Sequence, residues 1–157
     1  MALKSGGLAH IHETTMKYVL DRAAEPGTIV VASGVAGKVD VAGGTAAEVG
    51  ASGFWPIGLL LNTREEFNYA KELERVQYDT DDIGTVVALL RRGEVDTDML
   101  VENGGVSIAP GQPAYLAADG KLGNANLSVA GGEAQRVGQW MSAVDANGFA
   151  QVRIELQ

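Results

Sequence analysis

The sequence predicts a mainly β protein: a small β-barrel or β-sandwich-like domain that follows an extended N-terminal arm. Two observations support this fold class. The apolar segments are short and lie between clusters of Pro, Gly, Asn and Asp, which is typical of strands joined by turns. Several of these segments are rich in β-branched residues or alternate with a period of two, as half-buried strands do.

Length and composition predict one domain, or one domain and its arm, with a thin core. The chain has 157 residues, and its apolar fraction of 46% owes much to small residues. The aromatic residues number only 3 Phe, 2 Trp and 4 Tyr. Because a small chain with few large side chains buries little apolar area alone, we expect oligomerisation to add to its core.

Charge and cysteine content argue against several classes of protein. A formal net charge of −8 opposes binding to nucleic acid and to anionic membranes, which both attract basic surfaces. Without cysteine the chain has no disulfide, thiolate zinc site or cysteine nucleophile. No signal-peptide pattern opens the chain and no apolar run approaches 18 residues, so we expect no membrane span and synthesis in a reducing cytoplasm.

Residues 1–25 form the predicted arm. Gly6-Gly7 interrupts it, and the stretch that follows alternates only roughly between polar and apolar residues. We expect the arm to be extended and to contact a partner or a neighbouring subunit, with His10, His12 and Tyr18 as its contact residues. A frayed terminus is the alternative.

Residues 26–157 form the predicted β-rich domain. Pro56 cannot donate a ladder hydrogen bond, so it should begin its strand or lie at an edge. Arg91-Arg92-Gly93 should end the strand before it, and Asp119-Gly120-Lys121 should form a turn. The expected strands are 28–31, 38–41, 54–61, 85–90, 114–116, 136–141 and 149–156.

One stretch, residues 64–76, leaves two readings open. It is rich in helix-forming residues, and Phe67, Ala70 and Leu73 fall on one helical face. A short helix is the first reading and an extended connection is the second.

The two halves of the domain resemble each other. Pro26-Gly27 and Pro110-Gly111 each precede an apolar strand, and a Gly-Lys pair follows each about ten residues later. These matches suggest a degenerate duplication of one β unit, with copies at 26–62 and 110–156.

The inventory of reactive side chains predicts no enzyme, no cofactor and no metal site. His10 and His12 would share a face of a strand beside Glu13, but no further ligand cluster accompanies them. Nucleophile and base motifs are missing from the sequence. Phe54, Trp55 and Trp140 could line a ligand pocket, although aromatic residues more often supply core or interface area.

The C-terminal strands and turns carry a family resemblance. The blocks that carry it are Gly111–Leu116, Asp119–Leu122, Arg136–Trp140 and Ala150–Leu156, with Phe54–Leu60 and residues 85–93 in the middle of the chain. Over residues 26–156 this pattern resembles the small capsid decoration, or cement, proteins of tailed bacteriophages.

That resemblance implies a structural role without catalytic residues. Such a protein binds the outer surface of the phage head and stabilises contacts between major capsid subunits. It implies the major capsid protein and the chain itself as partners, in a homotrimer, and a place on the outer capsid surface after synthesis in the host cytoplasm. We expect the contact residues to be His10, His12, Tyr18, Phe54 and Trp55.

A receptor- or carbohydrate-binding β-module of a virion is the alternative function. Trp55 or Trp140 would then serve as a platform on which a sugar ring stacks.

Overall fold

The computed structural model describes residues 3–33, 35–41, 55–61, 65–68, 74–77, 86–102, 105–125 and 135–156. Within these ranges the chain is mainly β, which confirms the predicted fold class. The strands are β1 (Leu3–Leu20), β2 (Ile29–Ala32), β3 (Lys38–Val41), β4 (Pro56–Leu60), β5 (Glu65–Asn68), β6 (Glu74–Gln77), β7 (Val86–Thr97), β8 (Leu100–Val101), β9 (Pro113–Leu116), β10 (Leu122–Gly123), β11 (Arg136–Trp140) and β12 (Ala150–Glu155), with a 3₁₀ turn, η2 (Ala118–Gly120), between β9 and β10.

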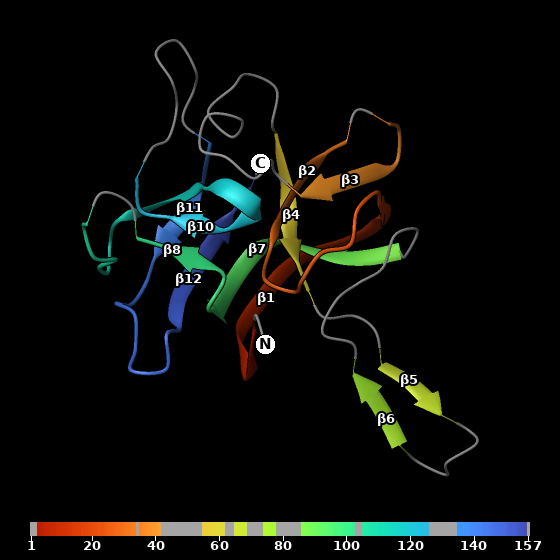
Figure 1. The fold of residues 1–157 in the computed structure, drawn as a ribbon, viewed down its shortest axis with the longest axis horizontal. Coiled ribbons are helices and arrows are strands. Elements are labelled where there is room, and N and C mark those ends of the chain that lie inside the picture. Colours follow the sequence, from red (N-terminus) through yellow and green to blue (C-terminus); the bar gives the residue numbers. More distant parts are fainter. Residues whose placement is uncertain are drawn as a thin grey trace.

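Ten strands form one sheet in the order β1-β3-β2-β4-β7-β12-β11-β9-β10-β8 (Figure 1). Because β1 also pairs with β7, the strands β1, β3, β2, β4 and β7 close into a barrel. The edge of β7 that does not pair with β1 pairs with two other strands. Leu89 and Leu90 pair with β4, and residues 92–97 pair with β12. The long strand β7 therefore belongs to both halves of the molecule.

Three strands at the centre are buried on both faces, which explains their unbroken apolar runs. In β7, Val87 and Leu89 pack in one buried cluster, while Ala88 and Leu90 pack in the other. The strands β2 and β4 divide their side chains in the same way. The barrel cluster contains Leu20, Ala24, Val30, Val39, Leu60, Val87 and Leu89.

The larger cluster fills the space between the barrel and the strands β9 to β12. In β12, Ala150, Val152 and Ile154 are buried, and the residues between them are partly or fully exposed, as expected for a half-buried strand. Trp140 of β11 is completely buried in this cluster. The C-terminal strands therefore hold the largest side chain of the core.

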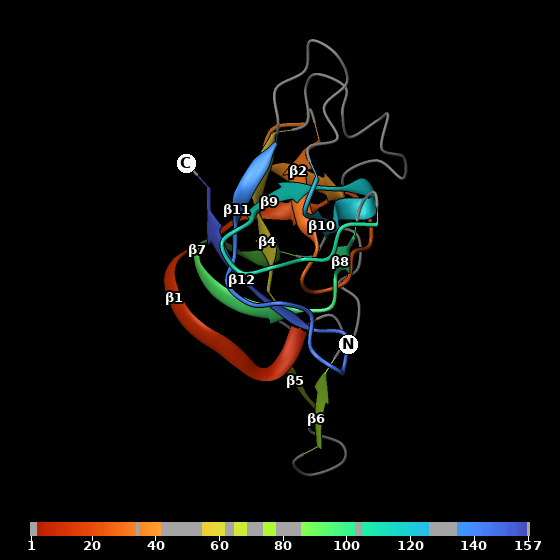
Figure 2. The same cartoon turned by 90° about the vertical axis from the view of Figure 1, so that its left-hand side faces the viewer.

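Of the two readings of residues 64–76, the short helix is wrong for the described part of that stretch, where the chain is extended. Residues 65–68 and 74–77 form an antiparallel pair, β5 and β6, with Phe67 in register with Arg75. A helix of this length is marginal without a packing partner, so its helix-forming composition does not decide its structure. Both views show the β5–β6 pair standing away from the main sheet (Figures 1 and 2).

The strand predicted at 85–90 is longer than expected. β7 runs through Arg91-Arg92-Gly93 to Thr97 because both of its edges are paired there, with β1 and with β12. The side chains of these polar residues give no strand signal in the sequence. Backbone hydrogen bonds along both edges of β7 nevertheless hold them in the strand.

Two predictions about proline and glycine agree with the structure. Pro56 begins β4, where its missing N–H group leaves the ladder intact. Asp119 and Gly120 both have positive φ, 56° and 68°, in the turn after β9. A Cβ atom on Gly120 would also collide with Thr28 and the carbonyl oxygen of Ile29, so glycine lets this turn lie against β2.

Residues 3–20 of the predicted arm form β1, an 18-residue strand antiparallel to β7. β1 curves along the outside of the sheet (Figure 2). Its largest register shift lies between Leu3 and Leu8, where five steps along β1 match two steps along β7. Gly6-Gly7 lies inside this bulge, a position where glycine is common. The division into an arm at 1–25 and a domain at 26–157 stays a prediction, as does the duplication of 26–62 and 110–156.

Candidate interaction surfaces

The first candidate surface is the outer edge of β1. On one side β1 pairs with β7 from Leu3 to Val19, and on the other side it pairs with β3 only at Val19 and Leu20. Among the described residues, no strand pairs with this outer edge along residues 3–17. An unpaired edge presents backbone N–H and C=O groups that can hydrogen bond to a strand of another chain.

Three of the five predicted contact residues lie on β1. His10 is in register with Glu94 and Tyr18 with Val87, both on β7, and His12 lies between Ile11 and Glu13 of β1. Tyr18 is half buried and packs against the barrel cluster. Tyr18 therefore helps to anchor β1, and its role as a contact residue for a partner stays a prediction.

The second candidate surface, here called the Trp55 patch, consists of exposed apolar residues at the end of β2, in the turn to β3 and just before β4: Ala32, Val35, Ala36 and Trp55. Trp55 is 62% exposed and Val35 is 53% exposed. The N–H group of Ala32, at the end of β2, donates to the carbonyl oxygen of Trp55 at 3.4 Å, so the two residues are neighbours. Val35 lies in the turn from β2 to β3, and its carbonyl oxygen accepts a hydrogen bond from the Lys38 N–H group at 3.0 Å.

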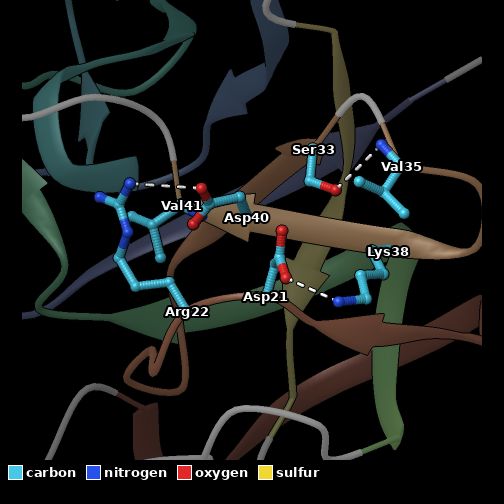
Figure 3. A network of polar contacts seen from close by, with 7 residues as sticks. All are labelled: Asp21, Arg22, Ser33, Val35, Lys38, Asp40 and Val41. Atoms are coloured by element: carbon cyan, nitrogen blue, oxygen red, sulfur yellow. Dashed lines mark hydrogen bonds and ion pairs between the residues drawn. The ribbon is translucent and has the colours of Figure 1, made fainter.

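Two ion pairs involve β3, the strand that follows the turn containing Val35 (Figure 3). Lys38 Nζ contacts Asp21 Oδ1 at 2.9 Å, and Arg22 Nη2 contacts Asp40 Oδ2 at 3.3 Å. Each pair joins the segment after β1 to β3. The four charges cancel, so these two pairs add no net charge to this part of the barrel.

The two tryptophans differ, although the sequence gives them equal weight. Trp140 is fully buried, and its Nε1–H group donates to the Gly123 carbonyl oxygen at 3.4 Å. The prediction that Trp140 could serve as a stacking platform for a ligand is therefore wrong. Trp55 is exposed and can still serve as one. Phe54 lies outside the described residues.

Sequence reasoning missed Val35 and the edge of β1. The signal for Val35 is an apolar residue inside the Ser33–Gly37 turn, where polar residues are usual. The unpaired edge has no signal in the sequence, because it depends on which strand pairs with which. A third exposed apolar residue, Val106, is 56% exposed in the segment before β9.

The part of the chain that the structure describes contains no group of three or more His, Cys, Asp or Glu side chains that could hold a metal ion. Over the same residues, no helix has the length and apolar character needed to cross a bilayer. The absence of enzymatic activity stays a prediction.

Comparisons with known proteins give a likeness in fold. No family model matches the chain, and no curated protein matches it. The fold is similar to that of a chain in the structure titled "The capsid of Myoviridae Phage XM1", with a TM-score of 0.56 and 18% sequence identity. The likeness covers 98% of this chain and 91% of that chain. At this identity the comparison establishes a shared fold.

Proposed function

We propose that the chain is a non-enzymatic structural protein of a phage head, which binds the outer surface of the shell and stabilises contacts between major capsid subunits. The observation that carries the proposal is the fold shared with a chain of the phage XM1 capsid over nearly the full length of both chains. The sequence resemblance to capsid decoration proteins supports the same function independently.

The two candidate surfaces fit this task. The outer edge of β1 can add its backbone hydrogen bonds to a strand of the shell, and the Trp55 patch can bury apolar area against it. A protein that binds the assembled shell and not its separated subunits stabilises the shell by mass action. Neither task requires a reactive side chain.

Self-association into a homotrimer is part of the proposal. The chain has few aromatic residues, and its largest buried cluster draws on both halves of a 157-residue chain. Contacts between subunits would add buried apolar area to the small amount that one chain of this size can bury alone. A net charge of −8 disfavours nucleic acid and membrane as further partners.

Deletion and substitution variants test the attachment. One variant lacks residues 1–16, so that Tyr18 and the fully buried Leu20 keep their packing. The second is Trp55→Ala, and Val106→Ala is its matched control because Val106 is an exposed apolar residue outside both surfaces. Binding to heads of the cognate phage is measured by co-sedimentation.

We expect each of the first two variants to bind at least tenfold more weakly than the control. Circular dichroism shows whether each variant is folded. Unchanged binding by the deletion variant would exclude the β1 edge as a contact with the shell, and unchanged binding by Trp55→Ala would exclude the patch.

A carbohydrate-binding role is a second candidate, because Trp55 presents its ring to solvent. Exposed tryptophan rings stack on sugar rings. Ser33 directly follows Ala32, whose N–H group donates to the Trp55 carbonyl oxygen, and offers a hydroxyl group. A glycan array separates the two functions. Binding to a glycan that is lost in Trp55→Ala and kept in Val106→Ala would favour this candidate, and an array without signal would remove it.

A further inference from the structure

We propose that β1 is an exchangeable strand: residues 3–17 leave the β7 of their own chain and pair in the same register with the β7 of a second copy. This inference deepens the self-association within the function proposed above and rests on it. It assigns the contact between copies to one strand pair, β1 with β7.

The described side chains of β1 that precede Tyr18 contribute little to the core. Among the residues of β1 whose side chains the structure describes, 13–15 and 17–20, Glu13, Thr14 and Lys17 are exposed and Thr15 is half buried. Among these described side chains, complete burial begins only at Leu20. A strand segment held mainly by backbone hydrogen bonds opens more readily than one held by apolar packing.

The contacts that hold this segment can form equally well between two copies. Glu13 is in register with Arg92, and its carboxylate also accepts from Arg91 Nη1 at 3.4 Å in an exposed ion pair. Pairing with the β7 of another copy restores the same ladder and the same ion pair. Exchange of an identical element between copies therefore needs no new complementary surface.

The structure also places the point at which the exchanging segment ends. Val19 N–H donates to the Gly37 carbonyl oxygen at 3.0 Å, and Asp21 N–H donates to the Val39 carbonyl oxygen at 2.8 Å. Leu20, between these two donors, is buried in the barrel cluster. These contacts join the end of β1 to β3 of its own chain.

Two ion pairs also join the residues directly after β1 to β3. Figure 3 shows Asp21 paired with Lys38 and Arg22 paired with Asp40, so two successive residues are tied to β3. Residues before Val19 have no comparable link to β3 in the described part of the chain. The chain can therefore bend just before Val19 while the barrel stays closed at Leu20.

The segment is long enough to reach a neighbour. Fifteen extended residues span about 50 Å at roughly 3.3 Å per residue. A compact chain of this size has a radius of gyration of about 15 Å, which corresponds to a diameter of about 40 Å. A released β1 thus extends beyond its own domain.

Cysteine pairs test the exchange cleanly, because the natural chain contains no cysteine. One chain carries Glu13→Cys and a second chain, with a mass tag, carries Arg92→Cys; both positions are exposed and in register. The two chains are mixed at high concentration, diluted and oxidised. Exchange brings the two cysteines together in different chains, so a disulfide-linked heterodimer of distinct mass forms.

The matched control is a mixture of Asp96→Cys and Gln151→Cys chains, whose positions are in register on β7 and β12. In the proposed exchange β12 stays with its own chain, so these chains would link only by random collision. We expect at least tenfold more heterodimer from the β1–β7 mixture than from the control. Equal yields would overturn the proposal. Because the assay contains no phage heads, that result would leave the proposed attachment to the shell standing.

Discussion

Arg153 of β12 and Glu94 of β7 form an ion pair between these two neighbouring strands: Nε and Nη2 of the guanidinium both donate to Oε1 of Glu94, at 2.9 and 2.6 Å. The carboxylate side chain is only 17% exposed, and the guanidinium is 41% exposed. The pair joins β12, which covers the larger cluster, to the strand shared by both halves.

A double-mutant cycle with Glu94→Gln and Arg153→Gln should give a coupling energy of about 1 kcal/mol, because two charge-assisted hydrogen bonds form at a partly buried carboxylate. The same cycle at Arg22 and Asp40, where the arginine side chain is 62% exposed, should give less than about 0.5 kcal/mol. Urea unfolding measures both. Equal coupling energies would show that burial does not distinguish the pairs.

Gly138→Ala should destabilise the protein by about 3 kcal/mol. A Cβ atom at Gly138 would collide with the backbone carbonyl of Arg153, and backbone atoms cannot move aside as a side chain can. Gly148→Ala is the control: its φ of 85° costs about 1 to 2 kcal/mol, but no atom lies within 4 Å of the new Cβ. Chemical unfolding that ranks the two variants in the opposite order would contradict the strand packing described here.

The two tryptophans should give opposite results in fluorescence quenching. Acrylamide should quench Trp55, which is 62% exposed, and leave Trp140, which is fully buried, nearly unaffected. Trp55→Phe should therefore leave a blue-shifted emission that resists quenching, and Trp140→Phe should leave a red-shifted emission that is quenched. Trp140→Ala should cost about 3 to 5 kcal/mol of stability. A quenchable Trp140 would contradict its place in the core.

Much of the fold follows from the sequence for a simple reason. The runs Ile29–Val31, Leu59–Leu61 and Val87–Leu90 are buried on both faces, so they show an unbroken apolar character that identifies them as strands. The alternation in Ala150–Glu155 identifies a half-buried strand in the same way. In these segments burial alone sets the residue type.

Where the structure differs from the sequence prediction, the difference depends on which strands pair with each other. β7 continues through Arg91 and Arg92 because strands flank it on both sides, and residues 65–68 pair with 74–77 despite a helix-forming composition. The same limit applies to the candidate surfaces. Trp55 and Trp140 are alike as residues, and only the packing of β11 in the larger cluster decides that one is buried and the other exposed.

Hydrogen exchange should show a gradient along the barrel. Amides of residues 3–17 in β1 should be at least about 100-fold less protected than those of Val87–Leu90 in β7, because their outer edge has no paired strand among the described residues. The described side chains of Glu13, Thr14, Thr15 and Lys17 also add little buried apolar area. Mass spectrometry of peptides from the two segments measures this directly. Equal protection would show that β1 is a fixed part of the barrel and would argue against exchange.

The most direct test of the proposed function is the binding of the purified chain to cognate phage heads that lack it. Co-sedimentation at increasing concentrations of chain, followed by thermal rupture of the loaded heads, measures attachment and stabilisation together. We predict saturable binding and a higher rupture temperature for the loaded heads, because a ligand of the assembled shell stabilises it by mass action. A chain that stays in the supernatant at every concentration would contradict the proposed function.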